Sequence, residues 1–170
     1  IPQQDFFLYA GRLSEEKGIS QLLETFSDLP KLKLKVVGDG PLKEGLIKKY
    51  IKYKNIMFIP HVKQSEVSLY MKQARTIIVP SLWYEVQPNV ILETLSCRQP
   101  IIIPKTANFS SWVPKKADVF TYKINDAKSL RRAILASILK KTPSPQEGSF
   151  SEVMNRFSPI FHYKNLMKIY

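Results

Sequence analysis

The fold of this 170-residue chain is decided by residues 6–29, whose sequence is FFLYAGRLSEEKGISQLLETFSDL. A short apolar and aromatic run comes first, with the length and composition of a buried β-strand. A charged loop follows, and then apolar residues recur at the spacing that lines one face of an α-helix. That stripe consists of Ile19, Leu22, Leu23, Phe26 and Leu29. The stretch therefore predicts a strand–loop–helix unit.

The same alternation continues along the chain and predicts an α/β fold. Strand-like composition is found at residues 6–10, 32–37, 56–59, 76–79, 100–103 and 118–121. Helix starts are predicted at Pro41, Ser65, Pro88, and either Asp126 or Ser129, the last helix having Leu130, Ile134, Leu135, Ile138 and Leu139 as its stripe. Right-handed crossovers between such strands build a doubly wound parallel sheet. We expect a Rossmann-like six-stranded domain at 1–141, a linker at 142–149 and a helical tail at 150–170.

The composition is that of a globular protein of one-domain size. With 26 Lys and Arg against 14 Asp and Glu, the formal charge is +12, and 44% of the residues are hydrophobic. No apolar run approaches the ~18 residues of a membrane-spanning helix, so we expect that the chain does not span a bilayer. A single cysteine, Cys97, excludes an internal disulfide and a thiolate metal site and suits a reducing compartment, so we expect a cytoplasmic protein, either free or at the inner face of the membrane. Because the chain begins at Ile1, we expect a piece of a longer protein.

The positive charge is concentrated between Lys31 and Lys54, where eight lysines face only Asp39 and Glu44. Such a field attracts any anion, whether a nucleoside diphosphate, an anionic lipid or a nucleic acid. The alternative is a set of solvated lysines on helix faces, which keep a protein soluble. Charge alone therefore limits the partner by sign and not by identity.

Two cationic residues follow the first predicted strand. Arg12 comes just after the strand, and Lys17 stands five residues later at the mouth of the next helix. A guanidinium binds two phosphate oxygens at once and an ammonium adds a compact second charge, so the pair can clamp a diphosphate. The alternative is ion pairing on the surface with Glu15 or Glu16.

Glycines follow the second predicted strand in Val37-Gly38-Asp39-Gly40-Pro41. They permit a tight turn and a close approach of the backbone to a ligand. The motif lacks the later glycine of the dinucleotide-binding fingerprint, so the sequence argues against a dehydrogenase.

The segment from Val79 to Glu93 combines a helix start with two carboxylates. With Pro88 as the first helical residue, the unpaired amides of the first turn form an anion site. Glu93, about one turn deeper, can accept hydrogen bonds from ribose hydroxyls, and Glu85 at the rim can hold a second sugar. A nucleotide sugar has that arrangement of charge and hydroxyls. The alternatives are a helical ion pair or a buried charge for Glu93 and an ordinary exposed acid for Glu85.

Taken together, these motifs resemble the C-terminal domain of retaining GT-B glycosyltransferases of family 4, over roughly residues 6–140. The residues that carry the resemblance are Gly11-Arg12-Leu13 with Lys17-Gly18, Val37-Gly38-Asp39-Gly40-Pro41, Phe58-Ile59-Pro60-His61-Val62, Pro80-Ser81, and Glu85 with seven residues before Glu93. The resemblance implies that Arg12 and Lys17 bind the diphosphate, that Glu85 positions the donor sugar and that Glu93 binds the ribose. The other donor-binding residues that it implies are Gly11, Gly38, Gly40, His61, Val62, Pro88, Asn89 and Val90.

The implied reaction is transfer of a hexose, with retention, from a UDP-, GDP- or ADP-sugar to a glycan or lipid-linked acceptor, as in polysaccharide biosynthesis of the cell envelope. No cofactor or metal is expected, and the chain has no Asp-x-Asp pair. The acceptor is expected on a separate N-terminal domain, so the chain alone should bind nucleotide and transfer little sugar. Val86-Gln87-Pro88 stands where many members have Gly-Phe-Gly, so the donor stays open.

Two other readings remain open. The first is a non-catalytic basic module that binds an anionic membrane or nucleic acid through Lys31 to Lys54; no recognised nucleic-acid motif is present, so we expect no nucleic-acid partner. The second is a catalytically inactive structural half.

Overall fold

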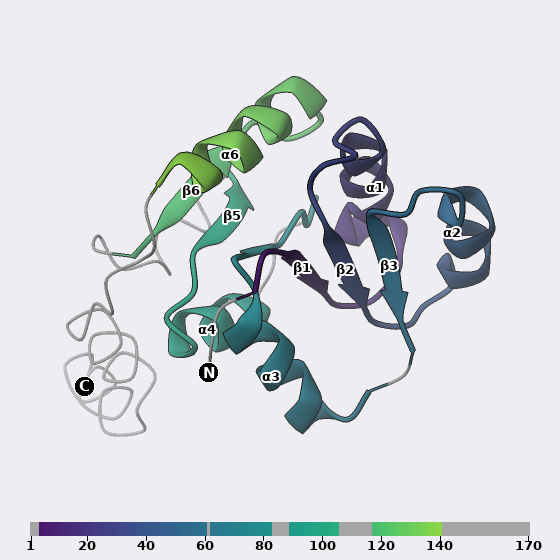
Figure 1. The fold of residues 1–170 in the computed structure, drawn as a ribbon, viewed down its shortest axis with the longest axis horizontal. Coiled ribbons are helices and arrows are strands. Elements are labelled where there is room, and N and C mark those ends of the chain that lie inside the picture. The colour runs from purple at the N-terminus through teal and green to yellow at the C-terminus, as the bar shows by residue number, and fades with distance from the viewer. Residues whose placement is uncertain (1–3, 61, 83–88, 106–116, 141–170) are drawn as a thin grey trace, which may run out of the picture.

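A computed structural model describes residues 4–60, 62–82, 89–105 and 117–140 and shows one sheet with helices on both faces (Figure 1). The strands are β1 (Phe7–Ala10), β2 (Leu34–Val37), β3 (Ile56–Ile59), β4 (Thr76–Ile78), β5 (Ile101–Pro104) and β6 (Val119–Tyr122). The helices are the 3-10 turn η1 (Glu15–Lys17), α1 (Ile19–Ser27), α2 (Lys43–Tyr50), α3 (Gln64–Gln73), α4 (Asn89–Ser96) and α6 (Ala127–Leu139).

All neighbouring strands run parallel, in the order β3-β2-β1-β4-β5-β6. The chain therefore starts in the middle of the sheet, moves outward to β3, and then crosses to the other side of β1. The predicted doubly wound, six-stranded parallel sheet is confirmed. In such a sheet the ligand crevice lies beyond the carboxyl ends of the strands where the order reverses, which here is between β1 and β4.

The sheet is buried on both faces, and successive residues of β1 point to opposite cores. Phe7 and Tyr9 pack among α1, α2 and α6, while Leu8 and Ala10 pack toward α3. The rings of Phe7 and Phe26 meet edge to face, with centroids 5.4 Å apart. Burial on both faces explains why the strands read as continuous apolar runs without polar alternation.

Three of the predicted helix starts needed the structure to decide them. The start of α2 at Pro41 was wrong by two residues, because α2 begins at Lys43 with Leu42 as its N-cap. The start of α3 at Ser65 was wrong: α3 begins at Gln64, and the Glu66 carboxylate accepts a hydrogen bond of 2.7 Å from the Lys63 amide. For α6, the Asp126 carboxylate accepts a hydrogen bond of 2.8 Å from the Ser129 amide, so Asp126 is the N-cap.

The predicted stripe of α6 was wrong in part. Leu135 and Leu139 are 41% and 84% exposed, whereas Ala133 and Ser137 are buried with Leu130 and Ile134. Small residues occupy the buried positions because the helix packs close to the sheet and to α1. The predicted start of α4 at Pro88, the linker at 142–149 and the tail at 150–170 lie outside the described residues.

One side chain ties together the turns that precede β2 and β3. The Asn55 side-chain amide lies 2.9, 3.2 and 3.1 Å from the carbonyl oxygens of Phe26, Leu29 and Leu32. The Leu34 amide in turn donates to the Asn55 carbonyl at 2.8 Å. The Phe26 and Leu29 carbonyls also accept backbone amides, from Leu29 at 3.0 Å and Leu32 at 2.9 Å, so the Asn55 amide adds a second donor to each and links the end of α1 to the turn before β3.

Asn55→Ala is expected to lower the free energy of unfolding by about 2 kcal/mol, because it removes the part-buried hydrogen bonds of the Asn55 side-chain amide to three carbonyl groups. Urea unfolding followed by circular dichroism measures the change. Lys54→Ala, at the adjacent exposed position, is the control and is expected to change stability by less than about 0.5 kcal/mol. Equal losses in both variants would show that the amide does not tie the two turns.

Candidate functional site

A cleft made of two adjoining hollows lies at the carboxyl ends of β1 and β4. Both hollows are lined by Ala10, Gly11, Arg12, Asn89 and Val90. The larger one, of about 440 Å³, extends to Val37, Gly38, Asp39, Val62, Val67, Met71 and Glu93. The smaller one, of about 230 Å³, extends to Tyr9, Lys17, Val79, Pro80, Ser81 and Ile91. The cleft therefore occupies the position that the strand order predicts for a ligand.

The backbone around Arg12 is held by the neighbouring loop that follows β2. The Gly11 amide donates to the Val37 carbonyl at 3.0 Å, and the Leu13 amide donates to the Asp39 carbonyl at 2.8 Å. Arg12 itself is exposed and borders both hollows. Arg12 therefore stands on an anchored backbone where the two hollows adjoin.

Gly38 and Gly40 serve this anchoring, because side chains at these positions would collide with the loop that carries Arg12. Their φ angles are 153° and 155°. A Cβ atom on Gly38 would lie 1.8 Å from the Gly11 carbonyl oxygen, and one on Gly40 would lie 2.5 Å from that of Leu13. Gly38 also lines the larger hollow, whereas Gly40 lines neither. The two glycines allow two loop backbones to pack in contact.

Lys17 lies in the turn η1, which is fastened to the end of β4. The Leu82 amide donates to the Glu16 carbonyl at 2.9 Å. Gly18 has a φ of 66°, and a Cβ atom there would lie 2.1 Å from the Pro80 carbonyl oxygen. Lys17 is half-buried and lines the smaller hollow. The structure thus brings Lys17 to the same cleft as Arg12.

The acid beside Lys17 is engaged by a neighbouring hydroxyl. The Ser14 hydroxyl donates to the Glu16 carboxylate at 2.5 Å. This hydrogen bond is the main cause that lowers the pKa of Glu16; the residue's own amide comes next, and the charges of Arg12 and Lys17 contribute least. Arg12 and Lys17, for which the alternative was ion pairing with Glu15 or Glu16, both border the cleft.

The first turn of α4 forms the opposite wall. Asn89 and Val90, the first two residues of the helix, line both hollows, and Glu93 lies one turn further on in the larger hollow. Burial raises the pKa of the half-buried Glu93 carboxyl, because desolvation disfavours its charged form. The cleft therefore combines two cations, a helix N-terminus and a partly desolvated carboxyl group.

The family model for glycosyl transferases group 1 matches residues 1–149. The chain belongs to this family. Bacillus subtilis TuaC, named as a teichuronic acid biosynthesis glycosyltransferase, is 33% identical over 134 residues, a match that covers 77% of this chain and 32% of TuaC. The chain thus spans about a third of that relative's length.

Solved structures show the same fold at lower identity. The C-terminal domain of the group 1 glycosyl transferase LpcC from Francisella tularensis superposes with a TM-score of 0.74 at 16% identity, covering 94% of this chain and 89% of that domain. Anabaena HepE in complex with UDP-glucose gives 0.79 at 18% identity, covering 98% of this chain and 48% of HepE. The fold of this group 1 glycosyl transferase domain is therefore that of the C-terminal half of a GT-B enzyme.

The cleft of this group 1 domain contains most of the predicted residues and several that were not predicted. Glu85, Pro88 and His61 lie outside the described residues, while Val62 lines the larger hollow. Val67 and Met71 of α3 also line it, although both also pack in the core between α3 and the sheet.

Neither a metal cluster nor a membrane span was found in the part of the chain that the structure describes. No three His, Cys, Asp or Glu side chains among those residues are grouped so that they could hold a metal ion. None of the described helices is long and apolar enough to cross a bilayer.

Glu93→Gln is expected to raise the melting temperature at pH 7, because it removes a carboxylate that folding partly desolvates. The pKa of Glu93 is raised in the folded state. At a pH below the unfolded-state pKa of 4.5 the carboxyl is protonated in both states and costs no stability, whereas at a pH above the folded-state pKa it is ionised in both states and the full penalty applies. The gain should therefore shrink as the pH falls toward 4. Thermal melts at several pH values measure it, with Glu44→Gln on the exposed face of α2 as the control. A gain that does not depend on pH would contradict the burial of an ionised Glu93.

Proposed function

We propose that this domain is the donor-binding half of a retaining glycosyltransferase that uses a nucleoside-diphosphate sugar. The observation that carries the proposal is the convergence of Arg12, Lys17 and the first turn of α4 on one cleft, with Glu93 beside them. The donor presents a diphosphate with hydroxyl-bearing sugars on either side. Cations and backbone amides match the diphosphate of such a ligand, and carboxylates match the hydroxyl groups of its sugars.

In this proposal, Arg12 and Lys17 bind the diphosphate and stabilise the negative charge that grows on it as the glycosidic bond to the nucleotide breaks. Amide groups at the start of α4 add positive potential at the same place. Preorganised donors of this kind typically contribute ~3 kcal/mol each to transition-state stabilisation. A metal ion is not required for this charge balance.

Glu93 is assigned to the ribose hydroxyls and Glu85 to the donor sugar, with His61 and Val62 near the base and Gly11, Gly38 and Pro88 shaping the cleft. Gly40 acts behind the cleft, by letting the loop after β2 pack on Leu13. The place of Glu93 in the wall of the larger hollow supports a role as an acceptor for ligand hydroxyls. A UDP-hexose is the first donor to test, because HepE has been solved with UDP-glucose.

The acceptor is proposed to be a glycan or a lipid-linked sugar, bound by an N-terminal domain. The name of TuaC, which refers to teichuronic acid, supports an envelope polysaccharide as product. Because the chain spans about a third of TuaC, we expect it to bind donor nucleotide alone and to transfer little sugar without the other domain.

Arg12→Ala and Lys17→Ala are each expected to weaken UDP binding about tenfold or more, because a charge-assisted hydrogen bond contributes ~1.5–3 kcal/mol. Isothermal titration calorimetry with UDP and GDP on the 170-residue chain measures the change. Arg131→Ala, an exposed arginine of α6 outside the cleft, is the matched control and should bind as the parent does. Undiminished binding in both cleft variants would refute the diphosphate clamp.

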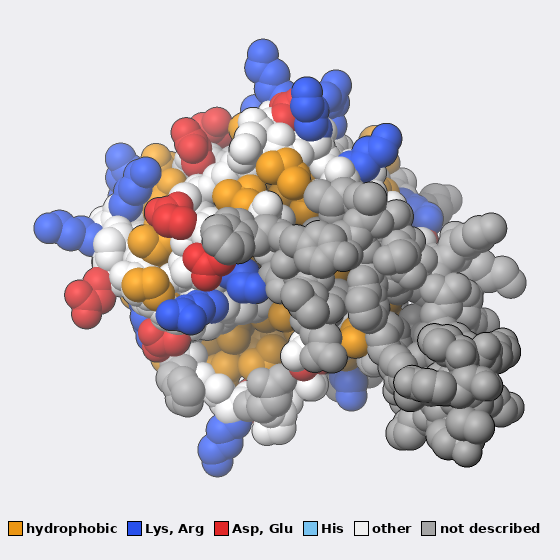
Figure 2. Space-filling model, turned by 180° about the vertical axis from the view of Figure 1, so that it is seen from behind, with side chains coloured by type: hydrophobic (Ala, Val, Ile, Leu, Met, Phe, Trp, Pro, Cys, Tyr) orange, Lys and Arg blue, Asp and Glu red, His pale blue; other side chains and the backbone are white. Residues whose placement is uncertain are grey.

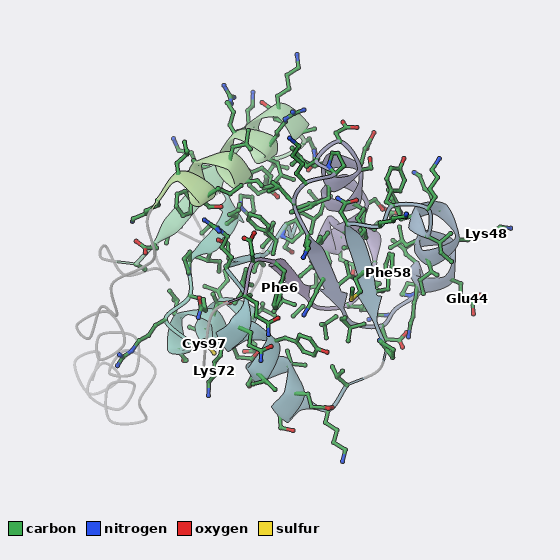
Figure 3. The ribbon with its side chains drawn as sticks, viewed as in Figure 1. Phe6, Glu44, Lys48, Phe58, Lys72 and Cys97 are labelled. Carbon is green, nitrogen blue, oxygen red and sulfur yellow. The ribbon has the colours of Figure 1, made fainter. Side chains whose placement is uncertain are left out.

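A second candidate function is docking of this domain on an anionic membrane. The turns that precede β2 and β3, which Asn55 ties together, carry the exposed residues Lys31, Lys33, Lys52 and Lys54 with Ile51, which is 77% exposed. On α2, Lys48 points away from the sheet but lies near Glu44 (Figure 3). Lysine and arginine side chains also project around the rim of the back view, with acids among them (Figure 2).

The two turns that precede β2 and β3 are a better docking surface than α2, because no acidic residue lies within 31–33 or 51–54. Each lysine near an anionic surface contributes ~1 kcal/mol, and the exposed Ile51 adds an apolar contact. These turns precede their strands, whereas the cleft follows the strands. A membrane bound at this edge would therefore leave the cleft open to a soluble donor.

Reversing the charge of this surface is expected to abolish flotation with vesicles containing phosphatidylglycerol. The variant changes four lysines to glutamate: Lys31, Lys33, Lys52 and Lys54. The control makes the same change of net charge at exposed lysines elsewhere: Lys63, Lys72, Lys105 and Lys128. The parent and the control should float at low salt and not at high salt. Flotation with neutral vesicles, equal losses in both variants, or binding to duplex DNA in place of vesicles would contradict membrane docking.

A further inference from the structure

We infer that Tyr9 is a positioning residue that holds the backbone of Arg12 so that its guanidinium faces the bound diphosphate. The inference rests on the proposed role of Arg12 in the cleft. Tyr9 lies in β1, is 3% exposed, and donates a hydrogen bond of 2.6 Å from its hydroxyl to the Arg12 carbonyl oxygen. The hydroxyl therefore reaches past the end of its own strand to the first cation of the cleft.

The backbone of Arg12 is held from two sides by groups of different origin. On the β1 side, the Tyr9 hydroxyl binds the Arg12 carbonyl, and on the β2 side the Leu13 amide donates to the Asp39 carbonyl at 2.8 Å. The peptide unit between Arg12 and Leu13 is thereby bonded at both its oxygen and its nitrogen. A peptide unit with both groups bonded has little freedom to rotate.

The loop also packs directly on the phenol group. A Cβ atom on Gly11 would lie 3.4 Å from the Tyr9 hydroxyl oxygen, which is the near edge of van der Waals contact. Gly11 thus lets the chain pass closely over the hydroxyl before it reaches Arg12. A longer side chain at position 11 would separate the two groups that form the hydrogen bond.

Removal of the Tyr9 hydroxyl alone can distinguish a positioning role from a purely structural one. A phenylalanine would fill the same core position beside the other apolar residues of β1, and a buried hydroxyl costs stability unless it is bonded. The guanidinium of an exposed arginine loses conformational freedom when it binds a ligand, and an anchored backbone reduces that loss. The gain from the hydroxyl should therefore appear in ligand binding through Arg12.

A double-mutant cycle tests this coupling with UDP as the probe. Tyr9→Phe is expected to raise the Kd for UDP about fivefold, the effect of one hydrogen bond, in the parent background. In the Arg12→Ala background the same change should have almost no effect, because the side chain that Tyr9 positions is gone. Tyr50→Phe, at an equally buried tyrosine outside the cleft, is the control and should leave the Kd unchanged.

The salt dependence of binding supplies a second measurement that packing alone does not alter. If Tyr9 acts through the charge of Arg12, Tyr9→Phe should flatten the plot of log Kd against log salt, as Arg12→Ala does. A loss of UDP affinity that is equal in both backgrounds, or a lower melting temperature with unchanged Kd and salt slope, would overturn the inference. Failure of the parent to bind UDP or GDP would instead remove the proposed function, and the inference with it.

Discussion

The close approach of loop backbones beyond the ends of β1, β2 and β4 is the constraint on which the rest of this structure depends. Gly38 packs on Gly11, and Gly18 packs on Pro80, at distances that leave no room for a side chain. These contacts draw together loops from strands on both sides of the point where the strand order reverses. The cleft exists because these loops can pack without side chains between them.

The electrostatic character of the cleft follows from that packing. Arg12 and Lys17 stand on two parts of one loop, and each part is fastened to a different strand end. The first turn of α4 approaches from the other side with its amide groups. Arg12 and the first turn of α4 border both hollows, while Lys17 borders only the smaller one and the partly desolvated Glu93 only the larger one. This arrangement of charge suits an anion that carries hydroxyl-bearing groups.

The sequence predicted the type and order of nearly every described element because burial on both faces of a parallel sheet leaves a strong signal. Residues 56–59 were predicted without error, and β1, β4, β5 and β6 within one residue at each end. The start of α3 was missed because Glu66, and not Ser65, provides the hydrogen bond at its N-terminus. In α6, helical spacing alone could not tell which leucines face the sheet, since Leu135 fits the period but not the contact.

The chain's order of strands, glycines and charged residues was enough by itself to predict the group 1 glycosyl transferase family and to place Arg12 and Lys17 after the first strand, because residue type and spacing are local properties. Only the tertiary structure decided that Gly40 supports Leu13 without bordering the cleft, that Val67 and Met71 line it, and that Tyr9 binds the carbonyl of Arg12. Those facts depend on how segments distant in sequence pack against each other. Packing distances of a few ångströms are set by the whole sheet and leave no mark in local sequence.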